Sequence, residues 1–388
     1  MIFISTMKIF GKIFLWLLVA MLAAWQIPWL IRYFAAVPSH VPFTLYSTVI
    51  EDFAMIRTEG DELEFIDRAG HRYTEKGFDS ILPLFYARQL NSEGRFPDSV
   101  SGRAVNIHEV LEHNFFFNSH PSDINCKKTG IYFLMESCSG RVDLEMPDDA
   151  FRFISGNGTI GGKAWTDGMA QDNGGIEFID MKKNDVLREK SEMFTSAMAE
   201  AGFSFPPKCL SGNPGTRKEY DEGYIIIDAA DKLFHLKMVK GRPYIRLIDL
   251  PSGVVPEHAF ITEFGDRRTI AFFTDTYDRM YAVCMPGYVT VRIGYIPESG
   301  IDKTCRTSDT ADCTFDPTEE SIYIIGNLID WTVRINSETS TRYYAINAND
   351  FSLISFMEYP SEPSWAERVP GIQFTSSKDK YVKPRIRK

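Results

Sequence analysis

Hydrophobic and polar residues alternate with a period of two through much of the chain. In "DWTVRIN" the side chains of Trp331, Val333 and Ile335 fall on one face, and the residues between them fall on the other. "YVTVRIG" and "LFHLKM" repeat this alternation, and short turns such as Lys240-Gly241 separate such runs. Period-two alternation with turn residues between the runs predicts strands with one buried face. We therefore expect a mainly β protein.

Three of the predicted strands end at a proline and recur along the chain. "RPYIRLIDLP", "YVTVRIGYIP" and "FSLISFMEYP" end at Pro251, Pro297 and Pro360. The first interval is typical of a propeller blade, which repeats every 40–50 residues, and the longer second one contains the polar excursion from Cys305 to Cys313.

The last of these units divides into four strands, which is the composition of one blade. We expect these strands near 322–326, 330–336, 341–347 and 351–358. The prediction is a β-propeller-like fold with about five to six blades. A β-sandwich with a separate α/β domain is the alternative.

Three helices are expected to interrupt the strands in the first half of the chain. One lies near 75–91, "EKGFDSILPLFYARQL". The second, near 107–114, follows Asn106 and has Glu109 three residues after it, which is a capping-box arrangement. The third, near 186–201, places apolar residues on one stripe and ends at Gly202. We interpret the helices as insertions into the β architecture.

An uncharged, largely apolar segment from Ile13 to Ile31 lies near the N-terminus. As a helix it rises about 28 Å, close to the hydrocarbon thickness of a bilayer. Lys8 and Lys12 precede it and Arg32 follows it, so the positive-inside rule predicts a cytoplasmic N-terminus.

A cleaved signal peptide is the alternative, but the apolar run continues past Ala23-Ala24 into Trp25 without a suitable cleavage site. We expect residues 1–36 to form a cytoplasmic stub and a single-pass anchor in the inner membrane. Residues 37–388 then form a periplasmic domain.

Charge and cysteine content narrow the class of protein. The formal net charge is −10, which argues against the phosphate-neutralising surface of a nucleic-acid-binding protein. The chain has six cysteines and no C-x-x-C pair, which excludes a zinc ribbon or a thioredoxin-like motif. Two disulfide bonds are candidates outside the cytoplasm, Cys305 with Cys313 and, more weakly, Cys126 with Cys138.

Two segments resemble known motifs but lack essential residues. "HEVLEH" has Glu112 where the zinc motif H-E-x-x-H needs its second histidine, and His113 lies on a different helix face from His108. "GNGTIGGKAW" has Asn157 in place of the first P-loop glycine and Ala164 in place of the magnesium-binding hydroxyl. We therefore predict no catalytic residues, no cofactor and no metal site from motifs.

One polar segment is a candidate recognition loop. In "NPGTRKEYDEG" the side chains of Arg217, Lys218, Glu219 and Tyr220 form a charged run before a predicted strand. The alternative is a solvated connection between strands. The basic C-terminal segment "DKYVKPRIRK" either closes the propeller with a final strand or contacts lipid head groups.

Phrases throughout the chain after the anchor resemble an uncharacterised family of Bacteroidota proteins classed as a domain of unknown function. These phrases are "FDSILPLFYARQL", "GRFPDS", "SGRVDLEMP", "NPGTRKEYDEGY", "LFHLKMVKGRPY", "IGNLIDWTVRIN", "YYAINANDFSL" and "KDKYVKPR". The resemblance implies a single-span envelope protein, often encoded beside ABC-transporter components, and it supplies no catalytic residues. The segment "GNGTIGGKAWTDGMAQDNG" and the cysteine-flanked loop are additions to the family's pattern.

These observations together lead to a non-enzymatic hypothesis. We expect a membrane-anchored extracytoplasmic accessory or binding protein of an ABC-type transport system, with the bilayer and the permease or ATPase subunits as partners. The alternative is an envelope hydrolase or lyase that acts on glycans through carboxylates in the propeller channel. Two carboxyl groups about 5–10 Å apart in a concave pocket would favour the alternative. A sensor or a structural scaffold is a third possibility.

Overall fold

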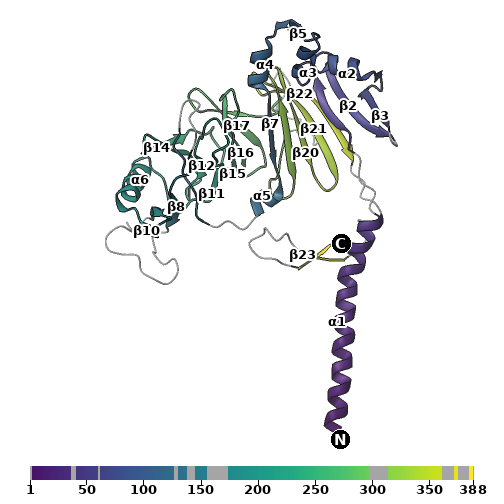
Figure 1. Ribbon diagram of the computed structural model, residues 1–388, viewed down its shortest axis with the longest axis vertical. Helices are drawn as coiled ribbons and strands as arrows, with labels where there is room; N and C mark the ends of the chain where they lie inside the picture. The colour runs from purple at the N-terminus through teal and green to yellow at the C-terminus, as the bar shows by residue number, and fades with distance from the viewer. Residues whose placement is uncertain are drawn as a thin grey trace.

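The protein is mainly β, as predicted, with 41% of its residues in strands. The computed structural model describes residues 2–35, 41–59, 62–125, 130–137, 145–154, 174–296, 313–360, 371–374 and 384–387. The N-terminal helix α1 (Ile2–Ala35) projects away from the β body (Figure 1). Within α1, the segment Phe10–Ile31 is long and apolar enough to cross a membrane. The expectation of one apolar N-terminal helix is therefore confirmed.

The strands of the described residues form five sheets of three to five strands, none of which closes on itself. The first contains β1 (Phe43–Ser47), β2 (Asp52–Glu59), β3 (Glu62–Asp67) and β4 (Arg72–Tyr73). The second contains β8 (Asp149–Ile154), β9 (Gly175–Asp180) and β10 (Asp185–Val186). The third contains β11 (Cys209–Gly212), β12 (Tyr224–Ile227), β13 (Leu233–Val239) and β14 (Arg242–Ile248).

The fourth and fifth sheets come from the second half of the chain. The fourth contains β15 (Pro256–Ile261), β16 (Thr269–Asp275), β17 (Met280–Cys284) and β18 (Val289–Arg292). The fifth contains β19 (Ser321–Gly326), β20 (Asp330–Asn336), β21 (Ser340–Asn347) and β22 (Leu353–Pro360). Its edge is β7 (Phe115–Ser119), which pairs antiparallel with β19. Two hairpins, β5 (Ser99–Val100) with β6 (Arg103–Ala104) and β23 (Gly371–Phe374) with β24 (Pro384–Arg387), complete the described strands.

The five sheets pack face to face in one continuous series. Buried residues of β1 and β2 contact those of β21 and β22, and the β19–β22 sheet shares a hydrophobic cluster with the β15–β18 sheet. The β15–β18 sheet packs in turn on the β11–β14 sheet, and the latter packs on β8, β9 and helix α6 (Arg188–Glu200). The β1–β4 and β8–β10 sheets lie at opposite ends of the series (Figure 1).

The structure confirms the repeating strand units. The three segments that end at Pro251, Pro297 and Pro360 contain β14, β18 and β22, each of which is the last strand of its sheet. The four strands expected between residues 322 and 358 are β19 to β22. Period-two alternation and proline punctuation are local signals, so they identified these strands without tertiary information.

A turn with the same construction recurs in four sheets. An aspartate at or just after the end of a strand accepts backbone N–H groups from residues two to four positions ahead: Asp67, Asp180, Asp228 and Asp275. Each turn also contains a residue with positive φ: Gly70, Asn184, Asp231 and Asp278. Gly, Asn and Asp tolerate this left-handed backbone, and the aspartate side chain fixes the turn. This shared construction supports an internal repeat.

One predicted helix is divided in the structure. The single helix expected over 75–91 is two helices, α2 (Glu75–Ile81) and α3 (Ala87–Ser92). Pro83 lacks a backbone N–H group and disfavours helical geometry at Leu82, whose φ of −120° and ψ of 52° end α2.

The two other predicted helices are present as α4 (Ile107–His113) and α6. Asn106 caps α4 by accepting the N–H of His108. Glu109 does not complete the capping box and accepts a hydrogen bond from Arg103 instead. A short helix α5 (Pro121–Asn125) was not predicted.

Candidate functional site

A cavity of about 490 Å³ lies between β1, the helices α2 to α4 and the strands β7, β19 and β20. Small-molecule sites commonly have such a volume, mostly apolar walls and a few polar groups. The apolar walls include Leu45, Ile81, Leu82, Leu84, Phe85, Tyr86, Leu111, Phe115 and Phe116. The polar residues include Thr48, Arg88, Asn114, Asn327, Asp330 and Thr332. We call this the β1–α4 cavity.

Hydrogen bonds between distant segments hold its walls together. The backbone N–H of Tyr46 on β1 donates to Thr332 Oγ1 on β20 over 2.8 Å. The Ser47 hydroxyl donates to the carbonyl of Ile81 at the end of α2 over 2.5 Å. Asn114 Nδ2, after α4, donates to the Leu84 carbonyl over 2.8 Å. The cavity therefore depends on the tertiary arrangement of four segments that are far apart in the sequence.

Asp330, the first residue of β20, is the only acidic residue among the described residues that line the cavity. It is 2% exposed. Asn327 Nδ2 donates to its Oδ1 over 3.1 Å, and the Thr48 side chain also bonds to it. Burial raises the pKa of the Asp330 carboxyl to about 7, and these two hydrogen bonds only partly oppose the shift. Within the described residues Asp330 has no ion pair, so a shifted carboxyl lies in an apolar cavity, a combination typical of functional sites.

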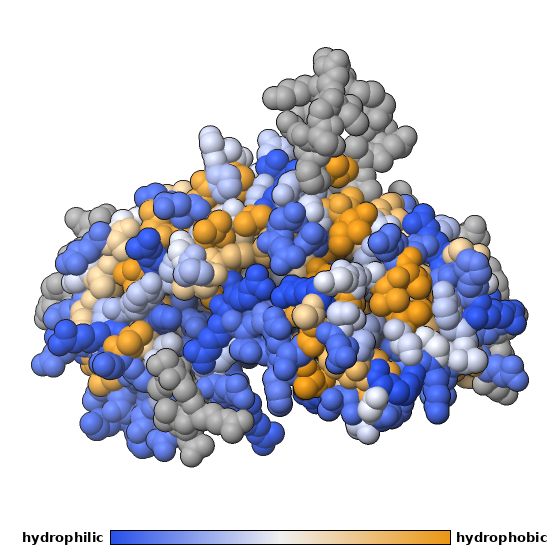
Figure 2. All heavy atoms as spheres, turned by 90° about the horizontal axis from the view of Figure 1, so that it is seen from above, coloured by the Kyte–Doolittle hydropathy of each residue, from blue (hydrophilic) through white to orange (hydrophobic). Residues whose placement is uncertain are grey.

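Aromatic side chains gather at the opening of the cavity. Phe85 and Phe116 are 40% and 56% exposed although both line it. The ring of Phe43 lies 5.8 Å from that of Phe85, and the ring of Tyr86 lies 5.0 Å from it. Figure 2 shows hydrophobic residues at several places on this face of the molecule. Exposed aromatic rings beside a cavity provide a contact surface for a ligand.

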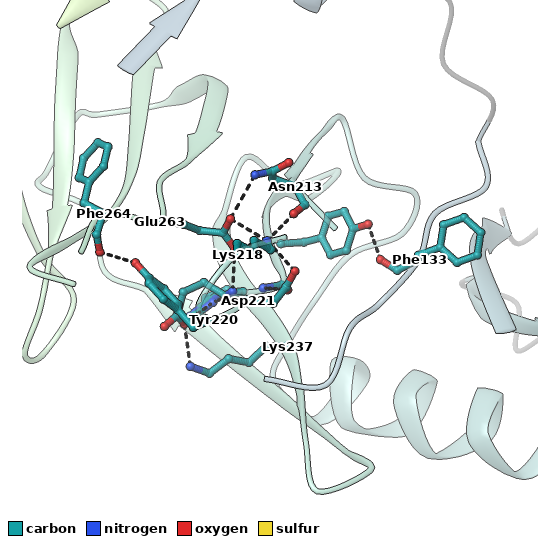
Figure 3. Close-up of polar contacts among 12 residues, drawn as sticks. Phe133, Asn213, Lys218, Tyr220, Asp221, Lys237, Glu263 and Phe264 are labelled. Atoms are coloured by element: carbon teal, nitrogen blue, oxygen red, sulfur yellow. Dashed lines mark hydrogen bonds and ion pairs between the residues drawn. The ribbon is translucent and has the colours of Figure 1, made fainter. Parts of the chain in front are cut away.

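The predicted recognition loop supplies a second polar centre, between β11 and β12. Lys218 lies among carboxylates, with its Nζ 2.6 Å from Glu263 Oε1 and 2.7 Å from Asp221 Oδ2 (Figure 3). The Tyr220 hydroxyl donates to the Phe264 carbonyl over 2.5 Å, and the Arg267 guanidinium covers its ring. These contacts tie the loop to the end of β15.

Two of the four predicted loop residues therefore face the protein, and two are at the surface. Lys218 is 17% exposed at its side chain and Tyr220 is buried, whereas Arg217 and Glu219 are exposed. The inward half of the loop joins two sheets.

His235 on β13 is a buried imidazole beside this loop. Its Nε2 donates to the Glu222 carbonyl over 2.6 Å, and its Nδ1 accepts the Tyr288 hydroxyl over 2.9 Å. Both ring nitrogens are thus used by the neutral form. Burial lowers the pKa of His235 to about 4, the Glu222 carbonyl opposes the shift, and the charge of Lys237 adds to it.

Acid should therefore destabilise the fold through His235. The imidazole takes up a proton near pH 6.5 in the unfolded state and only near pH 4 in the folded state. The contribution of neutral His235 to the free energy of unfolding is therefore fully present above pH 6.5 and is lost as the pH falls to 4. We expect wild type to lose about 3 kcal/mol over this interval relative to His235→Gln. Urea unfolding at several pH values measures the difference, and His108→Gln on the exposed face of α4 is the control. Parallel pH profiles for wild type and His235→Gln would contradict the prediction.

Comparison with protein families identifies the domain. The family described as Domain of unknown function (DUF4857) matches residues 43–160 and 166–346. The chain belongs to this family. The DUF4857 region contains the β1–α4 cavity with Asp330 and the Lys218 centre, and α1 precedes it. A comparison with curated proteins gives no match.

A search of solved structures lists the β-propeller domain of Cps50 (Swd1) from Myceliophteria thermophila. The match has 12% sequence identity and a TM-score of 0.28, and it covers 66% of this chain. It spans 62% of that protein's chain, which is less than two thirds of its length.

Several other predicted features of the DUF4857 chain can be located. Cys126, Cys138 and Cys305 lie outside the described residues, as does the "GNGTIGGKAW" segment, so the structure describes neither predicted disulfide. Cys313 is buried in the cluster between the β15–β18 and β19–β22 sheets. The described residues contain no group of three or more His, Cys, Asp or Glu side chains that could hold a metal ion.

The DUF4857 cavity itself was not predicted. Its acidic residue lies in "GNLIDW", at the start of β20. There Asn327 Oδ1 accepts hydrogen bonds from the backbone N–H groups of Ile329 and Asp330. The local pattern is that of an ordinary turn. The alternation of β20 places Asp330 out of line with the apolar face, and only the pairing of β7 with β19 and the approach of β1 reveal its burial.

Proposed function

We propose that this protein is a membrane-anchored binding protein that acts with an ABC-type transport system and catalyses no reaction itself. The observation that carries the binding role is the β1–α4 cavity, with its apolar walls, its exposed aromatic rings and the single buried carboxyl of Asp330. A ligand-binding site commonly combines an apolar surface with a few polar groups in this way.

The proposed location is the inner membrane, with α1 as a single-pass anchor and the β body in the periplasm. The side chains of the Phe10–Ile31 segment are largely exposed, as expected for a helix that contacts lipid or another membrane helix. Lys12 lies near the N-terminal end of this segment, and a positive charge there favours a cytoplasmic N-terminus. The partnership with permease and ATPase subunits rests on the family resemblance and on this exposed helix.

The β body is proposed to be propeller-like, with about five to six blades. Three sheets of four antiparallel strands in chain order and the recurring aspartate turns support this interpretation. Radial sheets would present rigid loop-covered faces to a partner. The hydrolase or lyase alternative needs two carboxyl groups in one pocket, whereas the β1–α4 cavity is lined by one.

Photo-crosslinking from α1 tests the partnership. We expect a benzoylphenylalanine at Phe14, which is 61% exposed, to crosslink to permease or ATPase subunits in native membranes. The same residue at Tyr277, 69% exposed on the β body, is the matched control and should not give these products. Identical products from both positions, or no transporter subunit from Phe14, would refute the partnership.

Labelling of intact cells with a membrane-impermeant amine reagent tests the location. The reagent should modify the β body if it is periplasmic.

A further inference from the structure

The buried carboxyl of the β1–α4 cavity has no cationic partner among the residues that the structure describes. Within the described residues, no lysine, arginine or histidine forms an ion pair with Asp330. Buried carboxylates are normally paired, because an isolated buried charge is costly. The Lys218 centre of the same protein follows that rule, with two buried carboxylates around one ammonium group. The β1–α4 cavity is the contrasting case.

Several side-chain donors on the cavity walls are already used by the protein, whereas two oxygen acceptors can still take hydrogen bonds from a ligand. The side-chain donors of Ser47, Asn114 and Asn327 are engaged with protein oxygens. Asn114 Oδ1 is buried and has no hydrogen-bond partner in the described part of the chain. A carboxyl and an unpartnered amide oxygen on the walls of one cavity complement a group that donates several hydrogen bonds.

Aromatic rings around the cavity complement a positive charge as well as an apolar body. Tyr46, Phe85, Tyr86, Phe115 and Phe116 all line it. The faces of aromatic rings attract ammonium groups, and more strongly where the cation is shielded from water. A cavity that is lined by aromatic rings and by one carboxylate therefore favours a cation that is attached to apolar atoms.

We propose that the β1–α4 cavity binds an organic amine with an apolar body, whose ammonium group bonds to the Asp330 carboxylate. The proposal rests on the binding role proposed above and adds the chemical class of the ligand. The apolar body contacts the walls formed by Ile81, Leu84 and Leu111 and extends toward Phe85 and Phe116 at the opening. An alkyl amine with a lipid-like chain and an alkyl amine that carries an aromatic ring share this chemistry.

Charged groups other than Asp330 also lie at or near the cavity. Arg88 of α3 lines the cavity but is exposed to solvent. Glu51 lies in the β1–β2 turn and Asp52 follows it. After burial, the negative charges of Asp330, Glu51 and Asp52 raise the pKa of the Tyr46 hydroxyl. Because the pKa of Asp330 is about 7, the ammonium group must displace a proton from it at lower pH. Amine affinity should fall about tenfold from pH 8 to pH 6.

Titration of the full-length chain in detergent with matched probes tests the proposal. 4-Phenylbutylamine and 4-phenylbutan-1-ol share one apolar body and differ in the ammonium group, and n-octylamine replaces the ring by a lipid-like chain. We expect both amines to bind at least tenfold more tightly than the alcohol at pH 8. Preference for one amine identifies whether the natural source is aromatic or lipid-like. The alcohol should show no pH dependence.

Variants locate the bound amine. Asp330→Asn should remove the tenfold preference for the amine, and Asp148→Asn, at a surface site that is 75% exposed, should leave it unchanged. Equal binding of amine and alcohol, undiminished amine binding to Asp330→Asn, or no binding of either amine at millimolar concentration would overturn the proposal. Crosslinking from α1 to transporter subunits is measured separately, so the transport role can survive a failure of the amine assignment.

Discussion

Replacing Lys218 by methionine is expected to destabilise the fold by about 3–5 kcal/mol. The ammonium group of Lys218 lies between Glu263 and Asp221, whose side chains are 9% and 2% exposed. Burial already raises the pKa of Glu263, and Lys218 is the main group that opposes this shift. Methionine preserves the length of the side chain but leaves two buried carboxylates without a cation. Urea unfolding of the full-length chain in detergent, followed by tryptophan fluorescence, measures the loss.

A matched surface lysine separates burial from charge. Lys182 pairs with Asp148 at 3.0 Å, and both side chains are 75% exposed. Lys182→Met should cost no more than about 0.5 kcal/mol because solvent screens this pair. Adding Glu263→Gln to Lys218→Met should restore part of the lost stability, since it removes one uncompensated charge. Equal losses for Lys218→Met and Lys182→Met would show that the cluster is solvated.

The Lys218 centre also shows where sequence interpretation reaches its limit. "NPGTRKEYDEG" contains five charged residues within a short run, and such a run is usually a solvated surface. The burial of Lys218 and Tyr220 depends on Glu263 and Phe264, which come from the next sheet. No local pattern reports that a carboxylate some forty residues later will accept the lysine.

Elements that depend on short-range chemistry were predicted well. The strands β19 to β22 follow from alternation and turn residues, and each of the three segments that end at a proline contains the last strand of its sheet. The helix expected over 75–91 was wrong in one detail, because the apolar spacing on both sides of Pro83 concealed a break that proline enforces. The β1–α4 cavity was missed because Thr48, Asn114 and Asp330 reach one cavity only when β7 pairs with β19 and β1 approaches β20.

Replacing Asp330 by asparagine is expected to stabilise the protein at alkaline pH. The folded-state pKa of about 7 lies above the ordinary aspartate value of 3.8. The folded state therefore holds a proton that the unfolded state releases, and stability falls as the pH rises from 3.8 to 7. Above pH 7 the wild type carries the full penalty, which corresponds to about 4 kcal/mol. Asparagine has nearly the same shape, does not ionise and can keep the hydrogen bond from Asn327.

The pH profile distinguishes this explanation from a packing effect. Asp330→Asn should exceed wild type by about 3–4 kcal/mol at pH 8, and the difference should shrink toward zero near pH 4. Asp148→Asn, at an exposed position, should show no such trend. A residue that lines a cavity and lowers the stability of the fold is typical of a functional site, because it is kept for binding although it destabilises the folded state. If Asp330→Asn were instead less stable than wild type at pH 8, the carboxylate would be a structural anchor of the β20 turn, and the binding role of the cavity would lose its main support.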